Sequence, residues 1–558
     1  MEQHYQIIVR DTEERVLSSM SRQCMEKASP FYGSFADKDE IVQAKYTAYR
    51  CVSMISCYCC RDSRFYRSGK LYQRIEAALS YIEKAQHENG LFDYVTCNFF
   101  SAPDTAFITK KLLPTFEYLK SLTAPSEEEK RICEQLDKII HKAAKGIAGG
   151  GFHTPNHRWA IASVLLKTWQ IYGDPELRKR AEQYLAEGID CNEDGEYSEK
   201  SAGNYNRINN DAMIAIGEVT GDPQYEEYVI RNLNMMLHYW EPDGSIFTAN
   251  STRYDKDRLT YPKNYYNEYM LMGERHHIPA FLQMCNRIMD ICDDKGLLAP
   301  DLLNYYLLHP EWRQTEEAES YQDEDYRVYY RNSGIVRVHS KDYTFTVMKD
   351  KTDFLYFHDG TIKVAMKVAG SFVQYRAFSG RSMEEIPGGY HLHQTMRGWY
   401  YLPWTDEQRP DTSDWWQMDN NRRDKTEGPD MDIDVYVTES EQRDGVDVRV
   451  VTGGVDGAPW RIEIAVMGAD FLQNENVAQY LRGGEAITIR KGMTRVQNER
   501  DAIIIGPAFG EHHFMEGKED SEGRMAGAST IYFTAYTGFD QTIQLRNVRT
   551  QLERENRL

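Results

Sequence analysis

The sequence predicts an α+β protein of two domains, an N-terminal (α/α) toroid of helical hairpins followed by a C-terminal antiparallel β-sandwich. The chain has 558 residues, of which 41% are hydrophobic, so it can bury a large core but exceeds one ordinary compact domain. The hydrophobic period is helical up to about residue 305 and alternating after about residue 326. We therefore expect a toroid over 1–315, a linker over 316–325 and a β-sandwich over 326–558.

Amphipathic helical runs follow one another through the first half of the chain. Two pairs of runs are separated by the same breaker, Gly173-Asp174-Pro175 and Gly221-Asp222-Pro223. Repeated helical hairpins of this form predict a toroid or solenoid of paired helices. The expected helices cover residues 41–53, 71–85, 110–122, 132–144, 159–172, 177–188, 208–220 and 225–239.

An acidic, weakly apolar stretch separates the two halves. Residues 310–325 contain Glu316-Glu317 and Asp323-Glu324-Asp325, which is typical of a linker. Short alternating segments with Gly and Asp turns then predict antiparallel sheets packed as a sandwich. The expected strands cover residues 326–330, 334–338, 343–348, 354–357, 363–368, 435–438, 446–451, 462–466, 486–489, 502–505 and 529–536.

The formal net charge of −20 and the absence of a Lys/Arg run argue against nucleic acid and anionic membranes as partners. A polyanionic ligand would need a positive field confined to a cleft. The N-terminus lacks a signal-peptide core and no apolar window reaches the length of a membrane span, so we expect a soluble, cytoplasmic protein. A homodimer is compatible with the sequence.

All ten cysteines fall between Cys24 and Cys292, a distribution unlike that of a disulfide-stapled secreted domain. We expect reduced thiols, with the CxxC spacing at Cys57 and Cys60 packed in a helix. His391 and His393 share a face if they lie on a strand, but no third ligand is near in sequence, so neither a metal nor a cofactor is expected.

The candidate chemistry lies at two predicted helix starts. Thr154 and Pro155 suit the N-cap and first position of a helix, which puts Asn156 and His157 in its first turn, where backbone N–H groups attract an anion. Tyr205 follows Ser201-Ala202-Gly203-Asn204 at another helix start. An amide, an imidazole and a phenol can hold a carboxylate and move a proton beside it. The alternative is that all three residues only cap and pack helices.

These residues resemble those of the heparinase II/III-like polysaccharide lyases, and the motif over residues 154–210 is closest to that of the oligoalginate lyases. The resemblance implies a toroid followed by a β-sandwich, and β-elimination on a uronic-acid glycan to leave a 4,5-unsaturated uronate end. It assigns contact with the uronate carboxylate to Asn156 and His157, and acid or base work to Tyr205. Such lyases also use a residue of the β domain, for which His358 and Tyr390 are the candidates.

Further residues suit a sugar cleft where the two domains are expected to meet. Arginine forks bind carboxylates and tryptophan faces stack on sugar rings. The candidate substrate-binding residues are Arg158, Trp159, Arg253, His393, Arg397 and Trp399.

Two other functions fit parts of the sequence. A glycoside hydrolase on a toroid would pair Asp194 with Glu196, Glu199 or Asp211 as acid and base. A non-catalytic carbohydrate-binding protein would need only the aromatic-rich composition. The linkage cleaved, and endo or exo action, stay open.

Overall fold

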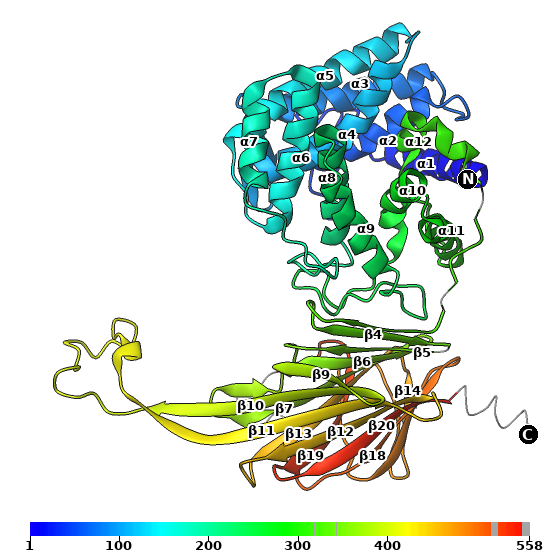
Figure 1. Cartoon of the computed structure of the whole chain (residues 1–558). Helices are drawn as coiled ribbons and strands as arrows, with labels where there is room; N and C mark the ends of the chain where they lie inside the picture. Colours follow the sequence, from blue (N-terminus) through cyan, green and yellow to red (C-terminus); the bar gives the residue numbers. More distant parts are fainter. Residues whose placement is uncertain (317, 323, 342, 515–522, 549–558) are drawn as a thin grey trace, which may run out of the picture. The chain divides into compact units, whose positions relative to one another are not determined.

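The computed structural model describes residues 1–316, 318–322, 324–341, 343–514 and 523–548, and its contacts divide into two units (Figure 1). The helical unit comprises Met1–Tyr239 and Ser245–Gln322. The β unit comprises Trp240–Gly244 and Asp323–Leu558, so it also takes in a short segment that follows the ninth helix. The order of a helical part and then an antiparallel β part confirms the predicted fold class.

The helical unit is a ring of helix pairs. The even-numbered helices α2, α4, α6 and α8 contact one another in turn, and the odd-numbered helices pack against them from outside. Helix α12 contacts α1, α2 and α4, and the Met1 amino group donates to the Thr315 carbonyl at 2.9 Å, which brings the ends of the unit together. The elements are α1 (Glu2–Met20), α2 (Ala44–Cys59), α3 (Gly69–Ala85), β1 (Phe92–Tyr94), β2 (Asn98–Ser101), α4 (Ala102–Ser121), α5 (Glu127–Gly149), α6 (Pro155–Tyr172), α7 (Pro175–Leu185), α8 (Tyr205–Thr220), α9 (Gln224–Met236), η1 (Pro262–Tyr265), α10 (Tyr266–His276), α11 (Pro279–Asp294), α12 (Leu303–Leu308) and η2 (Pro310–Gln314).

The two Gly-Asp-Pro breakers separate helices as predicted. Gly173 ends α6 at φ 72° and Gly221 ends α8 at φ 71°, a left-handed conformation that glycine adopts without steric cost. The Asp174 carboxylate caps α7 by accepting from the Glu176 N–H at 3.1 Å, and the Asp222 carboxylate accepts from the N–H of Gln224, the first residue of α9, at 3.0 Å. The same three residues therefore make the same hairpin turn twice.

The β unit is a sandwich of two nine-stranded sheets. One sheet has the order β15-β14-β17-β18-β20-β12-β11-β10-β9, and the other has the order β16-β19-β13-β7-β6-β5-β4-β3 with β8 paired to β7. Buried aliphatic and aromatic side chains of both sheets form one core between them. The elements are β3 (Tyr326–Tyr330), β4 (Ile335–Ser340), β5 (Tyr343–Met348), β6 (Asp353–Asp359), β7 (Ile362–Phe372), β8 (Tyr375–Ala377), β9 (Ser382–Ile386), β10 (Gly389–Tyr401), η3 (Asn420–Arg422), β11 (Lys425–Glu439), β12 (Gly445–Gly453), β13 (Pro459–Met467), β14 (Phe471–Gln473), β15 (Ala478–Tyr480), β16 (Ala486–Thr488), β17 (Gly492–Gln497), β18 (Ala502–Ala508), β19 (Ser529–Tyr536) and β20 (Asp540–Asn547).

The acidic stretch 310–325 is only partly irregular. Residues 310–314 form η2, and the contacts assign the chain up to Gln322 to the helical unit. Residues 317 and 323 of the predicted linker lie outside the described residues. None of the described helices has the length and apolar character needed to cross a membrane.

Candidate active site

The helical unit contains a cleft of about 800 Å³ that brings His157, Tyr205 and Arg253 together. Helices α6 and α8 present the first two residues from their first turns, and Arg253 comes from the chain between α9 and η1. A volume of this size suits a small number of sugar rings. The cleft also contains Tyr254, whose ring meets that of Tyr205 edge-on at 5.8 Å between centroids.

Positively charged side chains outnumber carboxylates around this cleft. Six are cationic, and they come from α2, α4, α8, η1 and the chain before η1: Lys45, Lys110, Lys111, Arg207, Arg253 and Lys263. The carboxyl groups are Asp104, Asp211, Glu268 and Asp301. Burial, and then the neighbouring Asp211 carboxylate, raise the pKa of Glu268 well above its usual range, which leaves that carboxyl protonated. Lys45, Lys110 and Lys111 each pair with one of these carboxylates, and Arg253 pairs with Glu199. The remaining surplus of cations gives the cleft lining a positive balance in spite of the net charge of −20 of the chain.

Asn156 lies behind the cleft wall, where it binds another residue of the chain. Its side chain is fully buried, and Nδ2 donates to both carboxylate oxygens of Glu199 at 2.9 Å. The Asn156 backbone N–H also points at Glu199, 3.3 Å from Oε2. The anion at the start of α6 is thus the Glu199 carboxylate, and contact of Asn156 with a substrate carboxylate stays a prediction.

Glu199 connects Asn156 to the cleft. Its Oε1 lies 3.3 Å from Arg253 Nε, and the Arg253 guanidinium carbon lies 5.1 Å from the centre of the Tyr205 ring. Burial raises the pKa of Glu199, and the hydrogen bond from Asn156 and the charge of Arg253 oppose that shift. The contacts from Asn156 to Glu199 and from Glu199 to Arg253 therefore hold the Arg253 cation beside Tyr205.

His157 faces the cleft as a neutral ring. Burial lowers its pKa to about 4, against the opposing effect of Asp104. Its Nδ1 is 3.4 Å from the His153 backbone N–H, so Nδ1 accepts and Nε2 carries the proton. His157 is thereby prepared to donate a hydrogen bond from Nε2.

The low pKa of His157 makes the protein less stable in acid. The folded state disfavours the charged form of the His157 ring. The free energy of unfolding that depends on this ring is therefore at its full value above the ordinary histidine pKa of about 6.5, and it falls as the pH falls toward 4. We expect the Tm to fall over that interval, and the His157→Gln variant to lose less, by on the order of a few degrees. Thermal melts at several pH values test this, with His4→Gln as the control because burial also lowers the pKa of His4 to about 4. Equal acid sensitivity in wild type and His157→Gln would contradict the assignment.

Two residues of α6 that were expected to bind substrate contact other residues of the protein. Arg158 pairs with Glu187 at 2.8 Å and Asp190 at 3.4 Å, and it stacks over the Trp159 ring. Trp159 is fully buried and its indole N–H donates to Asp190 at 2.9 Å. Trp159 therefore offers no face to a sugar, and Arg158 is not part of the cleft lining.

The candidate residues of the β domain are dispersed within the β unit. Tyr390 is buried in the sandwich core against Tyr329, with ring centres 5.8 Å apart. Imidazoles of His391 and His393 both contact one Asp434 oxygen, at 2.7 and 2.9 Å. Arg397 makes a two-point bond with Asp430, and Lys425 lies over the Trp399 ring at 4.1 Å. A catalytic role of Tyr390 and a role of His393, Arg397 and Trp399 in substrate binding stay predictions.

His358 belongs to a buried ionic cluster. Its Nδ1 lies 2.5 Å from Glu241 Oε2, and Glu241 also pairs with Arg337 at 2.9 Å and accepts from Thr344 at 2.7 Å. Burial opposes ionisation of Glu241, but Arg337 and then His358 hold the pKa of Glu241 well below its usual range. The cluster ties Trp240–Gly244 to strands β4, β5 and β6.

This setting predicts a stabilising role for His358. We expect His358→Ala to lower the free energy of unfolding by about 2 kcal/mol, since a buried hydrogen bond to a charged group is lost. Urea unfolding measures the effect, with the partly exposed His393→Ala as the control that changes little. Normal stability together with a strong loss of turnover would instead favour the catalytic role expected from the sequence.

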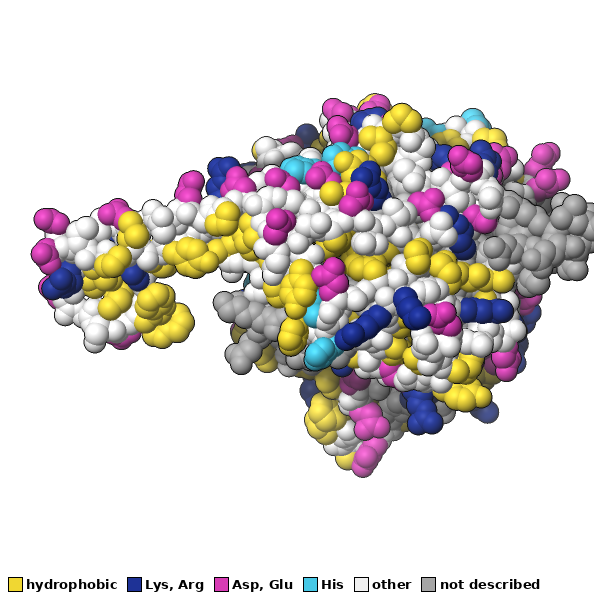
Figure 2. Space-filling model, turned by 90° about the horizontal axis from the view of Figure 1, so that it is seen from below, with side chains coloured by type: hydrophobic (Ala, Val, Ile, Leu, Met, Phe, Trp, Pro, Cys, Tyr) yellow, Lys and Arg dark blue, Asp and Glu magenta, His cyan; other side chains and the backbone are white. Residues whose placement is uncertain are grey.

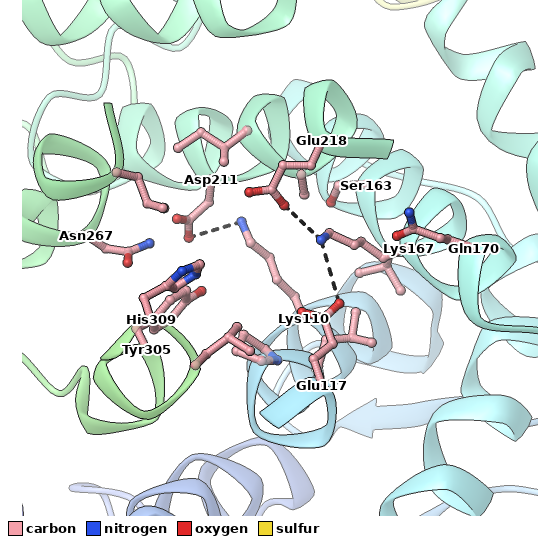
Figure 3. Close-up of a pocket in the computed structure, with 17 residues that line it drawn as sticks. Lys110, Glu117, Ser163, Lys167, Gln170, Asp211, Glu218, Asn267, Tyr305 and His309 are labelled. Carbon is pink, nitrogen blue, oxygen red and sulfur yellow. Dashed lines mark ion pairs between the residues drawn. The ribbon is translucent and has the colours of Figure 1, made fainter. Parts of the chain in front are cut away.

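A second cavity, of about 400 Å³, shares Lys110, Asp211, Asn267 and Tyr305 with the cleft (Figure 3). Lys110 pairs with Asp211 at 3.2 Å in their common wall. Lys167 pairs with Glu218 at 2.8 Å and with Glu117 at 3.6 Å. This second cavity contains neither His157 nor Tyr205, so we place the candidate site in the larger cleft.

Most of the cleft could not be found from the sequence. Lys45, Lys110 and Lys111 lie on helices whose periodic patterns give no sign of function. Tyr254 directly follows Arg253, and this position is the one feature of the sequence that could have indicated Tyr254 as part of the cleft. Glu199 was considered only as a hydrolase acid, because its 43-residue separation from Asn156 hides their contact.

No protein-family model matches the sequence, and no curated protein matches it significantly. Solved structures do resemble it. A Paenibacillus xanthan lyase aligns with a TM-score of 0.55 and 9% identity over 98% of this chain and 57% of the lyase. Heparinase III aligns with a TM-score of 0.55 and 8% identity over 94% of this chain and 80% of the enzyme. A chondroitinase AC lyase aligns with a TM-score of 0.50 and 10% identity over 97% of this chain and 82% of the enzyme.

All three structures are polysaccharide lyases, and the chain has their fold. The expected resemblance to heparinase-like lyases is confirmed at the level of the fold. The chain spans little more than half of the xanthan lyase, and fold alone does not fix an activity.

Proposed function

We propose that the protein is a lyase that cleaves a uronic-acid-containing oligo- or polysaccharide by β-elimination. The observation that carries this proposal is the cationic cleft of the helical unit, which joins a phenol, a neutral imidazole and an arginine in a chain of net charge −20. β-Elimination needs the same three properties: a positive field for the carboxylate, a hydrogen-bond donor to it, and a group that moves a proton.

The surplus of cations favours a carboxylate-bearing sugar. The proton next to an ionised carboxylate is weakly acidic, so the negative charge that develops when it leaves must be stabilised. Lysine and arginine side chains around the cleft provide this field, and the Nε2–H of His157 donates to the carboxylate. The Asn156 amide contributes indirectly, because it holds Glu199 and through it Arg253.

Tyr205 moves the proton. In its phenolate form, Tyr205 takes the C5 proton of the uronate on its oxygen, the C–H electrons form the C4=C5 double bond, and the electrons of the bond from C4 to the glycosidic oxygen leave with that oxygen. The departing oxygen then receives this proton from the Tyr205 hydroxyl, which restores the phenolate. Arg253 orients the Tyr205 ring and adds a positive charge beside the reacting groups.

The glycoside hydrolase alternative has less support. Asp194 and Glu196 are not among the residues of the cleft, and the buried Glu196 accepts from Asn250 at 2.5 Å. Asp211 does line the cleft and lies beside the protonated Glu268, a pairing that an acid and a base could share. However, Asp211 pairs with Lys110 at 3.2 Å, and the Glu268 side chain is fully buried, so neither carboxyl is placed to reach a glycosidic oxygen.

A panel of uronate-containing oligosaccharides tests the proposal. Elimination creates a double bond conjugated to the carboxylate, so ultraviolet absorbance should rise with at least one member of the panel. The matched neutral oligosaccharides, in which the uronate is reduced to the parent sugar, should give no signal. New reducing ends without any absorbance would show hydrolysis and refute the lyase assignment.

A further inference from the structure

Strands β10 and β11 continue beyond the sandwich as a two-stranded arm, drawn in yellow in Figure 1. Strand β9 pairs with β10 only through His393, and β12 pairs with β11 only from Asp432 onward. The two strands pair with each other as far as Tyr401 and Lys425. Met396 and Met431 still belong to the sandwich core, so we call residues 397–430 the β-arm.

The tip of the β-arm, residues 402–424, is held by its own hydrogen bonds. The Leu402 N–H donates to the Asp424 carbonyl at 2.8 Å, and the Arg423 side chain donates to the Leu402 carbonyl. The Asp414 carboxylate accepts from the Trp416 N–H at 3.0 Å, which fixes the turn that carries Trp415 and Trp416. The tip is therefore a defined surface and is prepared for contact.

Large apolar side chains of the β-arm face solvent. Trp416 is 90% exposed and Trp415 is 53% exposed, and Tyr400 and Leu402 are also exposed. Figure 2 shows hydrophobic side chains along the arm and at its end. A ribbon of two strands is only marginally stable in water, and exposed tryptophans mark binding surfaces.

The negative charge of the tip limits which partner can bind it. Residues 402–424 contain six carboxylates and three arginines, a formal net charge of −3. An acidic polysaccharide would be repelled by this surface. A partner should instead present cations, which also bind tryptophan faces.

The opposite edge of the same sheet offers such a surface. Residues 478–497 run from β15 at this edge, through β16 of the other sheet, to β17, and they contain four Lys or Arg residues and one glutamate, a formal net charge of +3. Lys491 pairs with the neighbouring Glu475 at 3.4 Å. All four cations are exposed: Arg482, Arg490, Lys491 and Arg495. Tyr480, which is 76% exposed, and the exposed Met493 add an apolar component. We call this the edge patch.

The β-arm cannot reach the edge patch of its own chain. Seven strand spacings separate β10 from β15 in the sheet order, a distance on the order of 34 Å, and the arm leaves the sheet at the far side. We propose that the β-arm of one copy binds the edge patch of a second copy. Because each copy carries both surfaces, two such contacts close a symmetric dimer.

The oligomeric state of the full chain tests this. Light scattering after size exclusion should give a dimer for the wild type and a monomer for Trp416→Ser. The matched control is Phe31→Ser, which replaces an exposed aromatic side chain of the helical unit and should leave the protein dimeric. Two charge-reversed proteins sharpen the test. One carries Glu407→Lys with Asp411→Lys in the arm, and the other carries Arg490→Glu with Arg495→Glu in the patch.

Each reversed protein alone should be monomeric, because its arm and patch then have the same sign. Mixed together they should form a heterodimer, since each arm again meets a patch of opposite sign. A monomeric wild type would overturn the proposal, as would a dimer that survives Trp416→Ser and both charge reversals. Loss of binding to a neutral polysaccharide on Trp416→Ser, with the oligomeric state unchanged, would also overturn it and assign the arm to sugar binding.

Discussion

Replacing Tyr205 by phenylalanine should lower turnover by about 100-fold or more while leaving the fold intact. The phenolic oxygen is the group that both removes and returns the proton in the proposed reaction, and loss of a positioned acid–base group has effects of this size. The ring itself keeps its contacts with Tyr254 and Arg253, so substrate binding should change little. Initial rates of absorbance increase at saturating and limiting substrate separate the two effects.

Tyr254→Phe is the matched control for this variant. Tyr254 lines the same cleft and its hydroxyl accepts from Asn204 at 2.9 Å, but it is given no proton to move. Its loss should cost far less turnover. If Tyr254→Phe is inactive and Tyr205→Phe is active, the proton-transfer assignment belongs to Tyr254.

Replacing Arg253 by alanine should reduce kcat/KM by on the order of 100-fold. The substitution removes the cation beside Tyr205 and leaves the buried Glu199 without its charged partner. Arg253→Lys should recover only part of the activity, because a lysine ammonium cannot reproduce the planar contact with both the Glu199 carboxylate and the Tyr205 ring.

Asn156 distinguishes an indirect role from contact with the substrate. If it acts by holding Glu199, Asn156→Ala and Glu199→Gln should impair turnover to similar extents, and the double variant should be little worse than either single one. Fully additive losses would mean that Asn156 has a function of its own at the substrate. Melting curves of each variant are needed, because both residues are buried.

The sequence predicts the fold well because its signals are local. The Gly-Asp-Pro turns, the helical periods and the alternating β segments each depend on neighbouring residues. The β-arm was missed because its residues are polar and aromatic and lack a regular alternation of buried side chains, which in β10 ends at Gly398 and in β11 begins only at Met431. Strands β1 and β2 were missed because they are short and lie among helices.

The site was predicted less completely, because its contacts are not local. His157, Tyr205 and Arg253 were named from the sequence and do line one cleft. The contact of Asn156 with Glu199 was not predicted, because nothing in the sequence reveals that Glu199 occupies the start of α6. His358 resembled a catalytic residue because the buried cluster formed by Glu241 and Arg337 becomes visible only in the folded sheet.

The masses of the reaction products test the central claim most directly. A purified uronate-containing oligosaccharide that the wild-type protein cleaves should yield two fragments whose masses add up to that of the substrate, because elimination adds no water, and Tyr205→Phe should form them at a greatly reduced rate. Fragments that together exceed the substrate by one water, formed at an undiminished rate by Tyr205→Phe, would contradict both the lyase assignment and the role of Tyr205.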